Sequence, residues 1–335
     1  MFDVARHVGV SHQTVSRVIN GSPNVSERTR AKVLAAIEEL GYQQNLAAKA
    51  LATGRTQTLG VLSFDSTLYG PTAMLHSIQV AARDHGYRVV LNSVDEISNT
   101  AISAGITELA NSHVDGILVI GPRSTVDTES LQLNVKVPVV FREVRDGEAL
   151  GVVDIDQQSA AAAATSHLTG LGHRVVAHIS GPLGWVTAER RKAGWLQALA
   201  ESGLAAGPFA EGDWTPRSGY LAATELLAAR KAAVSAGNPG FTGLFVANDA
   251  MALGALKAIR EAGLIVPEDI SVVGFDDTAE SEYSNPALTT VRQDFDLVGS
   301  KMLDLLLAAV DGGGSVTGSQ LVTAQLVVRD SAARV

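Results

Sequence analysis

Beyond Thr58, short apolar runs alternate with longer segments in which apolar residues recur at helical spacing. The runs are rich in valine and isoleucine and have the length of strands. They read, in order, TLGVLSF, YRVVLNS, DGILVIG, VPVVF, GVVDID, RVVAHISG, GLFVAND, ISVVGFDD and QLVTAQLVVR. Because apolar strands that alternate with helices form parallel sheets covered on both faces, the pattern predicts an α/β fold.

The segments between these runs predict the helices that cover the sheets. We expect helices near residues 73–85, 101–112, 159–171, 220–227, 251–261 and 295–310. About ten strands in this part of the chain are better divided between two doubly wound lobes than placed in one sheet. Ligands of such folds bind beyond the carboxyl ends of the strands, so the loops that follow strands are where chemistry is expected.

The first 44 residues have a different pattern, typical of short helices joined by tight turns. We expect one helix over residues 3–8, a second that Ser11 caps and that ends near Gly21, and a third that Ser26 caps and that ends at Gly41. Two short helices joined by a turn that contains glycine, followed by a third that closes the core, predict a helix-turn-helix head.

The second helix of this head, in the stretch VSHQTVSRVIN, has two distinct faces. At 3.6 residues per turn, Val15, Val18 and Ile19 gather on one side. The opposite side carries Gln13, Arg17 and Asn20. We expect the apolar face to pack against the other helices of the head. The polar face is exposed either to water or to a binding partner.

The segment NLAAKALATGRTQ, residues 45–57, is rich in alanine and reaches a glycine after about nine residues. A helix this short is unstable alone in water. We therefore expect this segment to need a partner in order to be helical.

The charge is divided unevenly along the chain. Residues 1–57 carry seven Lys or Arg against four Asp or Glu, a net charge of +3, although the whole chain has a net charge of −9. Because attraction to phosphates is local and is screened beyond roughly 10 Å at moderate salt, a basic head on an acidic body predicts an anionic partner for the head alone.

Several classes of protein are disfavoured by what the sequence lacks. It has no apolar run of membrane-spanning length and no basic-then-apolar signal segment at its start, so we expect a cytoplasmic protein without a membrane partner. The absence of cysteine excludes disulfides and thiolate chemistry. There is no nucleophile elbow, Walker loop or zinc-protease motif, and His173 and His178 do not have the spacing of a metal pair. We expect no enzyme activity, no cofactor and no metal.

Several loops that follow the predicted strands carry polar or aromatic side chains suited to polyols. Acids, amides and arginine can hold neighbouring hydroxyls through paired hydrogen bonds, and an aromatic face can cover a sugar ring. The candidates are Glu143, Asn248, Asp249, Asp276 and Asp277, together with Arg191, Trp214 and Phe295. Each also has a structural interpretation, since Asn248 or Asp249 could cap the helix that follows.

Both the head and the body of the sequence resemble those of a known family. The head DVARHVGVSHQTVSRVINGSPNVSERTRAKVLAAIEELGYQQNLAAKAL is similar to the DNA-binding domain of the LacI/GalR family of bacterial transcription regulators. The body is similar to that family's periplasmic-binding-protein-like effector domain, in the stretches GPLGWVTAERRKAGW, EGDWTPRSGY, VANDAMALGALKAI and DISVVGFDDTAESEYSNPALTTVRQDF. The resemblance spans nearly the whole chain.

The resemblance implies how the head meets DNA. The second helix would enter the major groove of double-stranded operator DNA, with His12, Gln13 and Arg17 at positions that meet bases. Ser11, Thr14, Ser16 and Asn20 match positions near phosphates. The hinge helix would begin at Asn45, and Leu51 matches a leucine that wedges into the minor groove. These residue types suit the roles, because arginine and glutamine read base edges through paired hydrogen bonds.

The resemblance also implies an effector site for a small sugar. Arg191, Trp214, Asn248, Asp276 and Phe295 match the sugar-contacting positions of a sugar-binding family member. Gln293, Glu143 and the loop from Leu68 to Pro71 would complete the lining. Three positions depart from that member: Glu143 replaces an aspartate, Ile120 an asparagine and Phe64 a serine. These longer or more apolar side chains would reshape the pocket, so a galactoside is only the first candidate.

The domain organisation expected from pattern and resemblance together has three parts. Residues 1–44 form the helix-turn-helix domain, 45–57 the hinge helix and linker, and 58–335 the effector-binding and dimerisation domain. Its N-lobe would take about residues 58–155 and 288–315, and its C-lobe about 156–287 and 316–330. No leucine-heptad tail follows QLVVRDSAARV, so we expect a homodimer that reads a pseudo-palindromic operator.

The resulting hypothesis is a sugar-responsive repressor that the sugar releases from its operator. A regulator of the same family in which the ligand acts as a corepressor is the closest alternative. A solute-binding protein of a sugar transporter shares the body fold, but the basic head and the missing signal segment disfavour it. A sugar-processing enzyme is disfavoured because the candidate carboxylates form no evident catalytic pair.

Overall fold

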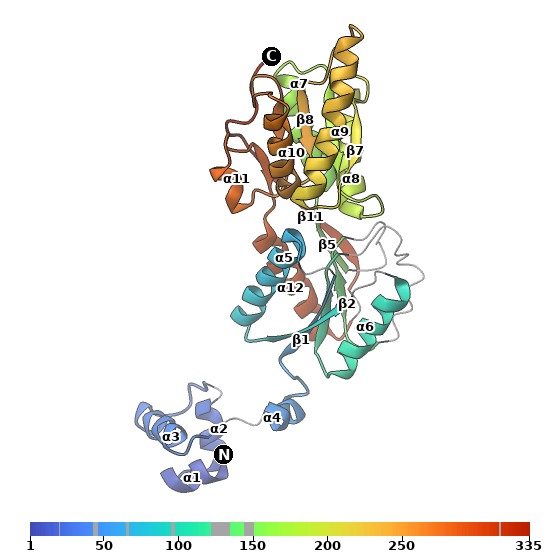
Figure 1. Ribbon diagram of the computed structural model, residues 1–335. Coiled ribbons are helices and arrows are strands. Elements are labelled where there is room, and N and C mark those ends of the chain that lie inside the picture. Colours follow the sequence, from blue (N-terminus) through green and yellow to red (C-terminus); the bar gives the residue numbers. More distant parts are fainter. Residues whose placement is uncertain are drawn as a thin grey trace. The chain divides into compact units, whose positions relative to one another are not determined.

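The structure is a computed structural model of the chain. It describes residues 1–19, 21–42, 46–64, 67–94, 98–121, 135–143, 151–314 and 316–335, without the side chains of 46–48 and 52. The chain divides into two compact units, a head of residues Met1–Gln57 and a body of residues Thr58–Val335 (Figure 1).

The head is a three-helix unit, as the sequence predicts. Its helices are α1 (Phe2–Val8), α2 (His12–Ile19) and α3 (Glu27–Glu39). They pack around a small apolar core that is completed by side chains from all three helices: Val4, Ala5, Val15, Val18, Val33 and Ala36. Burial of this face fixes which residues of α2 are left on the surface.

Both predicted caps of the head are confirmed. Ser11 Oγ accepts a hydrogen bond from the backbone N–H of Thr14 at 3.1 Å, and Ser26 Oγ accepts one from Thr29 at 3.3 Å. Each satisfies an amide that the first helical turn leaves without a partner.

The hinge segment forms the short helix α4 (Leu46–Thr53). Lys49 Nζ donates to Gln57 Oε1 at 2.6 Å, and Thr53 Oγ1 donates to the carbonyl of Lys49 at 2.9 Å. The side chain of Leu51 is 90% exposed, so it packs against little within its own unit.

The body contains two parallel sheets, which confirms the predicted α/β class. The sheet of the N-lobe has the order β11-β5-β4-β3-β1-β2, with every neighbouring pair parallel. Its strands are β1 (Thr58–Phe64), β2 (Arg88–Val94), β3 (Gly116–Val119), β4 (Val139–Phe141), β5 (Gly151–Ile155) and β11 (Gly318–Val322).

Helices cover both faces of this sheet because β1 is apolar on both sides. Leu59 and Val61 pack with α5 (Tyr69–Asp84) and α12 (Phe295–Gly312), whereas Leu62 and Phe64 pack with α6 (Asn99–Asn111). This alternation follows from the two-residue repeat of a strand. Figure 1 shows α5 and α12 together on one face and α6 on the other.

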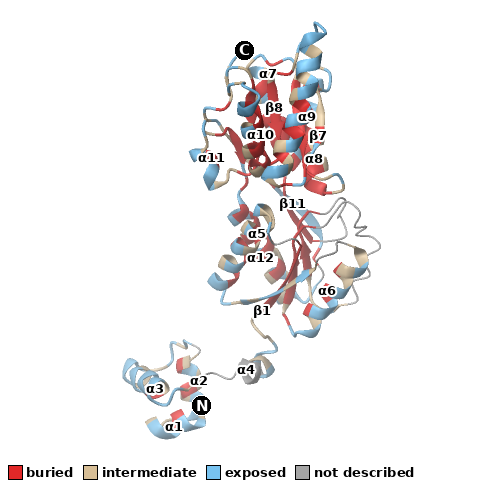
Figure 2. Ribbon diagram, viewed as in Figure 1, coloured by how far each residue is buried: buried red, intermediate tan, exposed pale blue. Residues whose placement is uncertain are grey.

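The C-lobe has a parallel sheet of order β7-β6-β8-β9. Helices α7 (Gln157–Gly170) and α8 (Val186–Glu201) cover one face, and α9 (Pro216–Ser235) and α10 (Asp249–Glu261) cover the other. The strands are β6 (Val176–Ser180), β7 (Phe209–Glu211), β8 (Gly243–Val246) and β9 (Ser271–Val273). Figure 2 shows the central strands of both lobes buried beneath helices whose outer surfaces are exposed, whereas the edge strands β2 and β11 of the N-lobe sheet are largely exposed.

Two glycines bring α9 and α10 unusually close. A Cβ added to Gly254 would lie 1.9 Å from the carbonyl oxygen of Pro216, and one added to Gly219 would lie 2.2 Å from that of Met251. Glycine is therefore required at this crossing because the backbones themselves are in contact.

Near the C-terminus, the expected boundaries between the two lobes are wrong. Two short segments each belong to the lobe opposite to the one predicted. Residues 318–322, expected in the C-lobe, form β11 and pair with β5 of the N-lobe. The strand β10 (Thr290–Arg292), expected in the N-lobe, pairs with β12 (Gln325–Val327) and is bridged to the end of β9. The apolar run QLVTAQLVVR is thus two strands in different sheets, which its continuous hydrophobicity does not reveal.

Three further elements differ from the predicted pattern. The helix predicted over 220–227 is the much longer α9, because Thr215 caps it and Pro216 occupies its first turn. The helix predicted from residue 73 begins at Tyr69. A short helix α11 (Ala279–Tyr283) follows β9, where no helix is predicted.

Candidate functional site

A pocket lies at the carboxyl ends of strands from both lobes of the body. Its volume is about 450 Å³ when its open mouth is counted. It is lined by Leu68, Tyr69, Gly70, Pro71, Arg142, Glu143, Trp185, Thr187, Arg191, Trp214, Asn248, Asp276 and Gln293. The first six come from the N-lobe and the next six from the C-lobe, while Gln293 lies on the segment that joins them.

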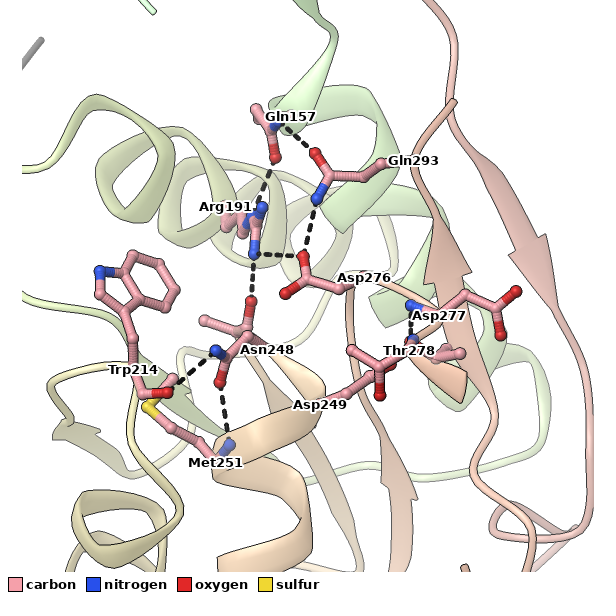
Figure 3. Close-up of polar contacts among 12 residues, drawn as sticks. Gln157, Arg191, Trp214, Asn248, Asp249, Met251, Asp276, Asp277, Thr278 and Gln293 are labelled. Carbon is pink, nitrogen blue, oxygen red and sulfur yellow. Dashed lines mark hydrogen bonds and ion pairs between the residues drawn. The ribbon is translucent and has the colours of Figure 1, made fainter. Parts of the chain in front are cut away.

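A closed ring of hydrogen bonds holds Arg191 in this pocket (Figure 3). Arg191 Nε donates to Gln157 Oε1 at 2.8 Å, and Gln157 Nε2 donates to Gln293 Oε1 at 2.9 Å. Gln293 Nε2 donates to Asp276 Oδ1 at 2.7 Å, and the ion pair from that oxygen to Arg191 Nη1, at 3.5 Å, closes the ring. Arg191 Nη1 also donates to the carbonyl of Ala247. Four side chains therefore fix one another before any ligand arrives.

Asp276 keeps one carboxylate oxygen for other partners. The bonds from Gln293 and Arg191 both reach Oδ1, and the second oxygen points toward the space between Arg191, Asn248 and Trp214 in Figure 3. Burial raises the pKa of Asp276 to about 7, although the neighbouring Arg191 guanidinium favours the ionised form. The carboxylate can accept hydrogen bonds from ligand hydroxyls when it is ionised.

Asn248 acts as a helix cap and lines the pocket. Its Oδ1 accepts from the backbone N–H of Met251 at 2.9 Å and so caps α10. Its Nδ2 donates to the carbonyl of Trp214 at 3.1 Å, which joins the start of α10 to the loop before α9. Asn248 therefore caps α10 with the same side chain that lines the pocket.

The wall of the pocket on the N-lobe side carries a second ion pair between a carboxylate and an arginine. Arg142 and Glu143 follow β4 directly, and Arg142 Nη1 lies 2.7 Å from Glu143 Oε1. Both residues are buried. The pocket thus has one ion pair on each side, Arg142 with Glu143 and Arg191 with Asp276.

Aromatic side chains form much of the remaining surface. Trp185 and Trp214 contact each other edge to face, with ring centroids 6.2 Å apart. The Arg191 guanidinium lies 5.6 Å from the Trp214 ring centroid. Tyr69, from the first turn of α5, adds an aromatic edge from the other lobe. Flat apolar faces next to paired polar groups are suited to a pyranose ring.

Three lining residues have left-handed backbones although none is glycine. The φ angles are +63° for Glu143, +73° for Trp214 and +117° for Asp276. Such conformations cost free energy in residues that have a Cβ, and they concentrate at functional sites. They direct these three side chains into the pocket from loops that follow strands.

The structure places most of the expected effector residues on this pocket. They are Leu68, Pro71, Glu143, Arg191, Trp214, Asn248, Asp276 and Gln293. Phe295 is not among the residues that line the pocket. Its ring packs edge to face on Tyr69 and lies under the Arg142 guanidinium. Phe64 and Ile120, expected to reshape the pocket, lie in the apolar cores of the N-lobe.

The two remaining candidate acids have structural partners instead. Asp249 is fully buried and accepts from Thr290 Oγ1 at 2.6 Å and Ser281 Oγ at 2.7 Å, and burial raises its pKa to about 6. Asp277 is paired with Arg292 and Arg329, whose hydrogen bonds outweigh its partial burial and lower its pKa. Neither lines the pocket.

Sequence reasoning missed three lining side chains, which are Arg142, Trp185 and Thr187, whereas Tyr69 lies in the expected loop from Leu68 to Pro71. A signal existed for Arg142, since it also follows the run VPVVF, immediately before Glu143. Trp185 and Thr187 lie in the loop and first turn after β6, and the rule on strand ends could have found them.

In the head, the polar face of α2 is directed away from the core. Gln13 and Arg17 are exposed, while Val15 and Val18 are buried and Ile19 is half-buried. The expected phosphate-contacting residues are held close to the start of this helix: Ser11 Oγ and Thr14 Oγ1 lie 2.9 Å apart, and Ser16 is half-buried.

Four other expected DNA contacts lie at the start of α2, outside the described residues or on α4. His12 is exposed, and its ring packs on Phe2 with centroids 5.1 Å apart. Asn20 and Asn45 lie outside the described residues. Leu51 is exposed on α4.

Within the described ranges, no cluster of three or more His, Asp or Glu side chains is arranged to hold a metal ion. His178 lies in the C-lobe core, stacked on Phe245 and Trp195, and burial lowers its pKa to about 3. No described helix is both long and apolar enough to cross a membrane.

Two family models match the chain, one over each unit. Residues 1–45 match the model described as "Bacterial regulatory proteins, lacI family". Residues 165–332 match the model of a periplasmic binding protein-like domain.

Curated relatives match along almost the whole length of the chain. The lactose operon repressor of Escherichia coli (strain K12) is 36% identical over 332 residues, which cover 98% of this chain and 89% of that protein. The HTH-type transcriptional regulator CelR of Thermobifida fusca is 34% identical over 342 residues, covering 98% and 96%.

Solved structures agree with this relationship. A lac repressor dimer bound to operator and the anti-inducer ONPF superimposes with a TM-score of 0.84 at 36% identity, covering 99% of this chain and 98% of that one. A complex of the regulator CelR with cellobiose superimposes with a TM-score of 0.73 at 32% identity, covering 98% of both chains.

Proposed function

The chain belongs to the LacI family of bacterial regulatory proteins, and on that basis we propose that it is a repressor that a small neutral sugar releases from operator DNA. Membership of the family makes it an effector-responsive transcriptional regulator and not an enzyme. The proposal concerns the class of effector, the direction of its action and the residues that act.

The pairing of charges in the pocket carries the proposal for a neutral ligand. Each cation that lines it, Arg142 or Arg191, has a carboxylate partner in Glu143 or Asp276. An anionic effector would have to compete with these carboxylates, whereas hydroxyl groups can donate to the acids and accept from the arginines at the same time. The indoles of Trp185 and Trp214 supply apolar surface for a sugar ring.

Relatives support a sugar but leave its identity open. A galactoside is the first candidate, because the related lactose operon repressor matches along the chain. The structure of the related CelR holds cellobiose, which makes glucosides the next candidates.

For the head we propose that two copies of the chain read a pseudo-palindromic operator. Gln13, Arg17 and His12 would meet base edges, and Ser11, Thr14 and Ser16 would lie near phosphates. Leu51 would enter the minor groove at the centre of the site, which would account for an apolar side chain so exposed. A homodimer is proposed because the related lac repressor binds operator as a dimer.

Sugar binding between the lobes would change their angle and disfavour the operator-bound arrangement. By reciprocity, operator DNA must weaken sugar affinity by the same factor. A corepressor mechanism uses the same pocket and predicts the opposite sign of coupling.

The test is a binding experiment across a panel of galactosides, glucosides and pentoses. Operator fragments selected from random pseudo-palindromes are titrated with the full chain by fluorescence anisotropy, with and without each sugar. We expect at least one sugar to weaken operator binding about tenfold or more, within the range of known allosteric couplings. Equal operator affinity with every sugar would refute the inducer role, and stronger binding would establish a corepressor.

A further inference from the structure

The pocket wall of the N-lobe contains a buried cation that the expected site did not include. Arg142 lines the pocket and is only 2% exposed. Its guanidinium lies 5.3 Å from the ring centroid of Phe295, which supports its flat face from behind. The side chain is therefore fixed in place at the surface that a ligand would contact.

Arg142 retains hydrogen-bonding capacity after its contacts within the protein. A guanidinium has five N–H donors in a fixed plane. Nη1 is paired with Glu143, while Nε is buried and has no acceptor among the residues that the structure describes. A buried N–H without an acceptor costs free energy, so a small shift of the guanidinium that opens Nε to a ligand oxygen in the pocket would gain affinity.

The partner of Arg142 is also held in a fixed direction. Glu143 is 7% exposed, and its left-handed backbone at φ +63° restricts where its carboxylate can lie. Together the pair presents donors and acceptors side by side on the N-lobe. One hydroxyl can accept from Arg142 while its neighbour donates to Glu143, which is the arrangement that a vicinal diol offers.

We propose that Arg142 is a specificity-determining residue that, with Glu143, selects an effector with adjacent hydroxyl groups on the end that faces the N-lobe. This inference rests on the proposed sugar-binding function and deepens it. The pocket then holds its ligand by two polar pairs, Arg191 with Asp276 on one side and Arg142 with Glu143 on the other. A glycoside whose N-lobe end is apolar would bury both charges of the second pair without new partners, so such ligands are rejected.

The chain offers a matched control for this proposal. Arg190 also pairs with a buried carboxylate on the N-lobe, that of Asp154, at 2.5 Å. Arg190 does not line the pocket, however. Replacing either arginine removes an ion pair to a buried carboxylate, although the Arg190 side chain is 29% exposed and that of Arg142 only 2%. Only Arg142 lines the pocket, where it can distinguish one ligand from another.

The experiment measures how each hydroxyl contributes to affinity. Methyl β-D-galactopyranoside, methyl β-D-glucopyranoside and their 2-, 3-, 4- and 6-deoxy analogues are titrated into the full chain, wild type and variants. Trp185 and Trp214 line the pocket, so intrinsic fluorescence reports binding, and calorimetry checks the constants. In the wild type, we expect loss of a hydroxyl that a charged group recognises to weaken binding about tenfold or more.

In Arg142→Met, the loss of affinity caused by removing a hydroxyl should fall to about twofold or less at one or two adjacent hydroxyls. It should persist at the hydroxyls that the C-lobe recognises. Arg142→Met/Glu143→Gln, which leaves no buried charge unpaired, should behave in the same way and covers the case in which the single variant does not fold. Arg190→Met should leave every ratio unchanged.

Two outcomes overturn the proposal and are distinguishable. If the wild type binds the parent sugars but the ratios are the same in the Arg142 variants, or all ligands weaken equally, Arg142 does not determine specificity. If neither parent sugar binds the wild type, the assignment of a galactoside or glucoside effector fails and this inference fails with it.

Discussion

Asp154 Oδ2 and Arg190 Nη1 lie 2.5 Å apart and join strand β5 of the N-lobe to helix α8 of the C-lobe. The next residue along α8, Arg191, lines the pocket and belongs to its ring of hydrogen bonds. One turn of α8 therefore contacts both the opposite lobe and the effector site.

Arg190→Met should destabilise the body by about 2 kcal/mol, because it removes the charged hydrogen-bond donor of the buried Asp154 carboxylate and leaves Arg142 as the remaining nearby cation. Asp154→Asn/Arg190→Met should recover most of this loss, since no unpaired charge remains. Urea denaturation of both variants and the wild type measures the difference. Equal stability of the single and double variants would show that the Asp154 carboxylate costs nothing in the absence of Arg190.

The same pair predicts a pH dependence. Burial raises the pKa of Asp154 to about 6, above the ordinary aspartate value near 4, so the folded state binds this proton more tightly than the unfolded chain does. This group's contribution to the free energy of unfolding therefore falls as the pH rises from about 4 to about 6. In Arg190→Met the fall should extend to higher pH, because the loss of Arg190 disfavours the carboxylate further. Denaturation curves at a series of pH values compare the two slopes, and parallel slopes would contradict the assignment.

Effector affinity should decrease as the pH falls through about 7. Asp276 accepts a proton there, because burial raises its pKa to about 7, and the protonated acid accepts hydrogen bonds from ligand hydroxyls less well. Asp276→Asn should bind the effector more weakly, with little pH dependence in this window. Titration of the effector between pH 5.5 and 8.5 tests this, and a wild-type affinity that is constant over that range would refute it.

Gly254→Ala should destabilise the body by about 2 kcal/mol or more, because the new Cβ would lie 1.9 Å from the backbone oxygen of Pro216. The control is Gly170→Ala at the end of α7, where a Cβ would have nothing within 4 Å. That change should be neutral or slightly stabilising, since alanine favours helix more than glycine does. Thermal unfolding of the two variants measures the contrast, and similar midpoints would mean that α9 and α10 can separate without cost.

In the head, Arg17→Ala should remove about 2 kcal/mol of discrimination between the selected operator and variants changed at one base pair. Ser16→Ala should weaken binding to all sequences more evenly, because its expected partner is a phosphate. Anisotropy titrations against the operator and its single-base variants measure both effects. Unchanged discrimination in Arg17→Ala would remove Arg17 from the base-reading face.

Much of the fold follows from local patterns in the sequence. Val-rich and Ile-rich runs predict the buried parallel strands, and Ser11 and Ser26 mark the starts of α2 and α3. The exchange of β10 and β11 between the lobes could not be found in this way. Which sheet a short apolar strand joins depends on contacts with residues far away in sequence, as for Leu321 opposite Asp154.

In the site, the sequence pattern also fails to predict which of two neighbouring residues lines the pocket. Asp276 and Asn248 were expected because they follow strands, and both line the pocket. Asp277 and Asp249 are their neighbours in sequence, yet each turns to structural partners. Adjacent residues after a strand point in different directions, so the strand-end rule finds the loop but does not choose between the two side chains.

The left-handed backbones of Glu143, Trp214 and Asp276 have an evolutionary consequence. Such conformations persist only where the surrounding structure holds them in place, so a new loop path would require changes in the neighbours as well. Side chains on a fixed backbone can be exchanged one at a time at much lower cost. We therefore expect related proteins that respond to other molecules to keep the course of these three loops and to differ in the side chains that the loops carry.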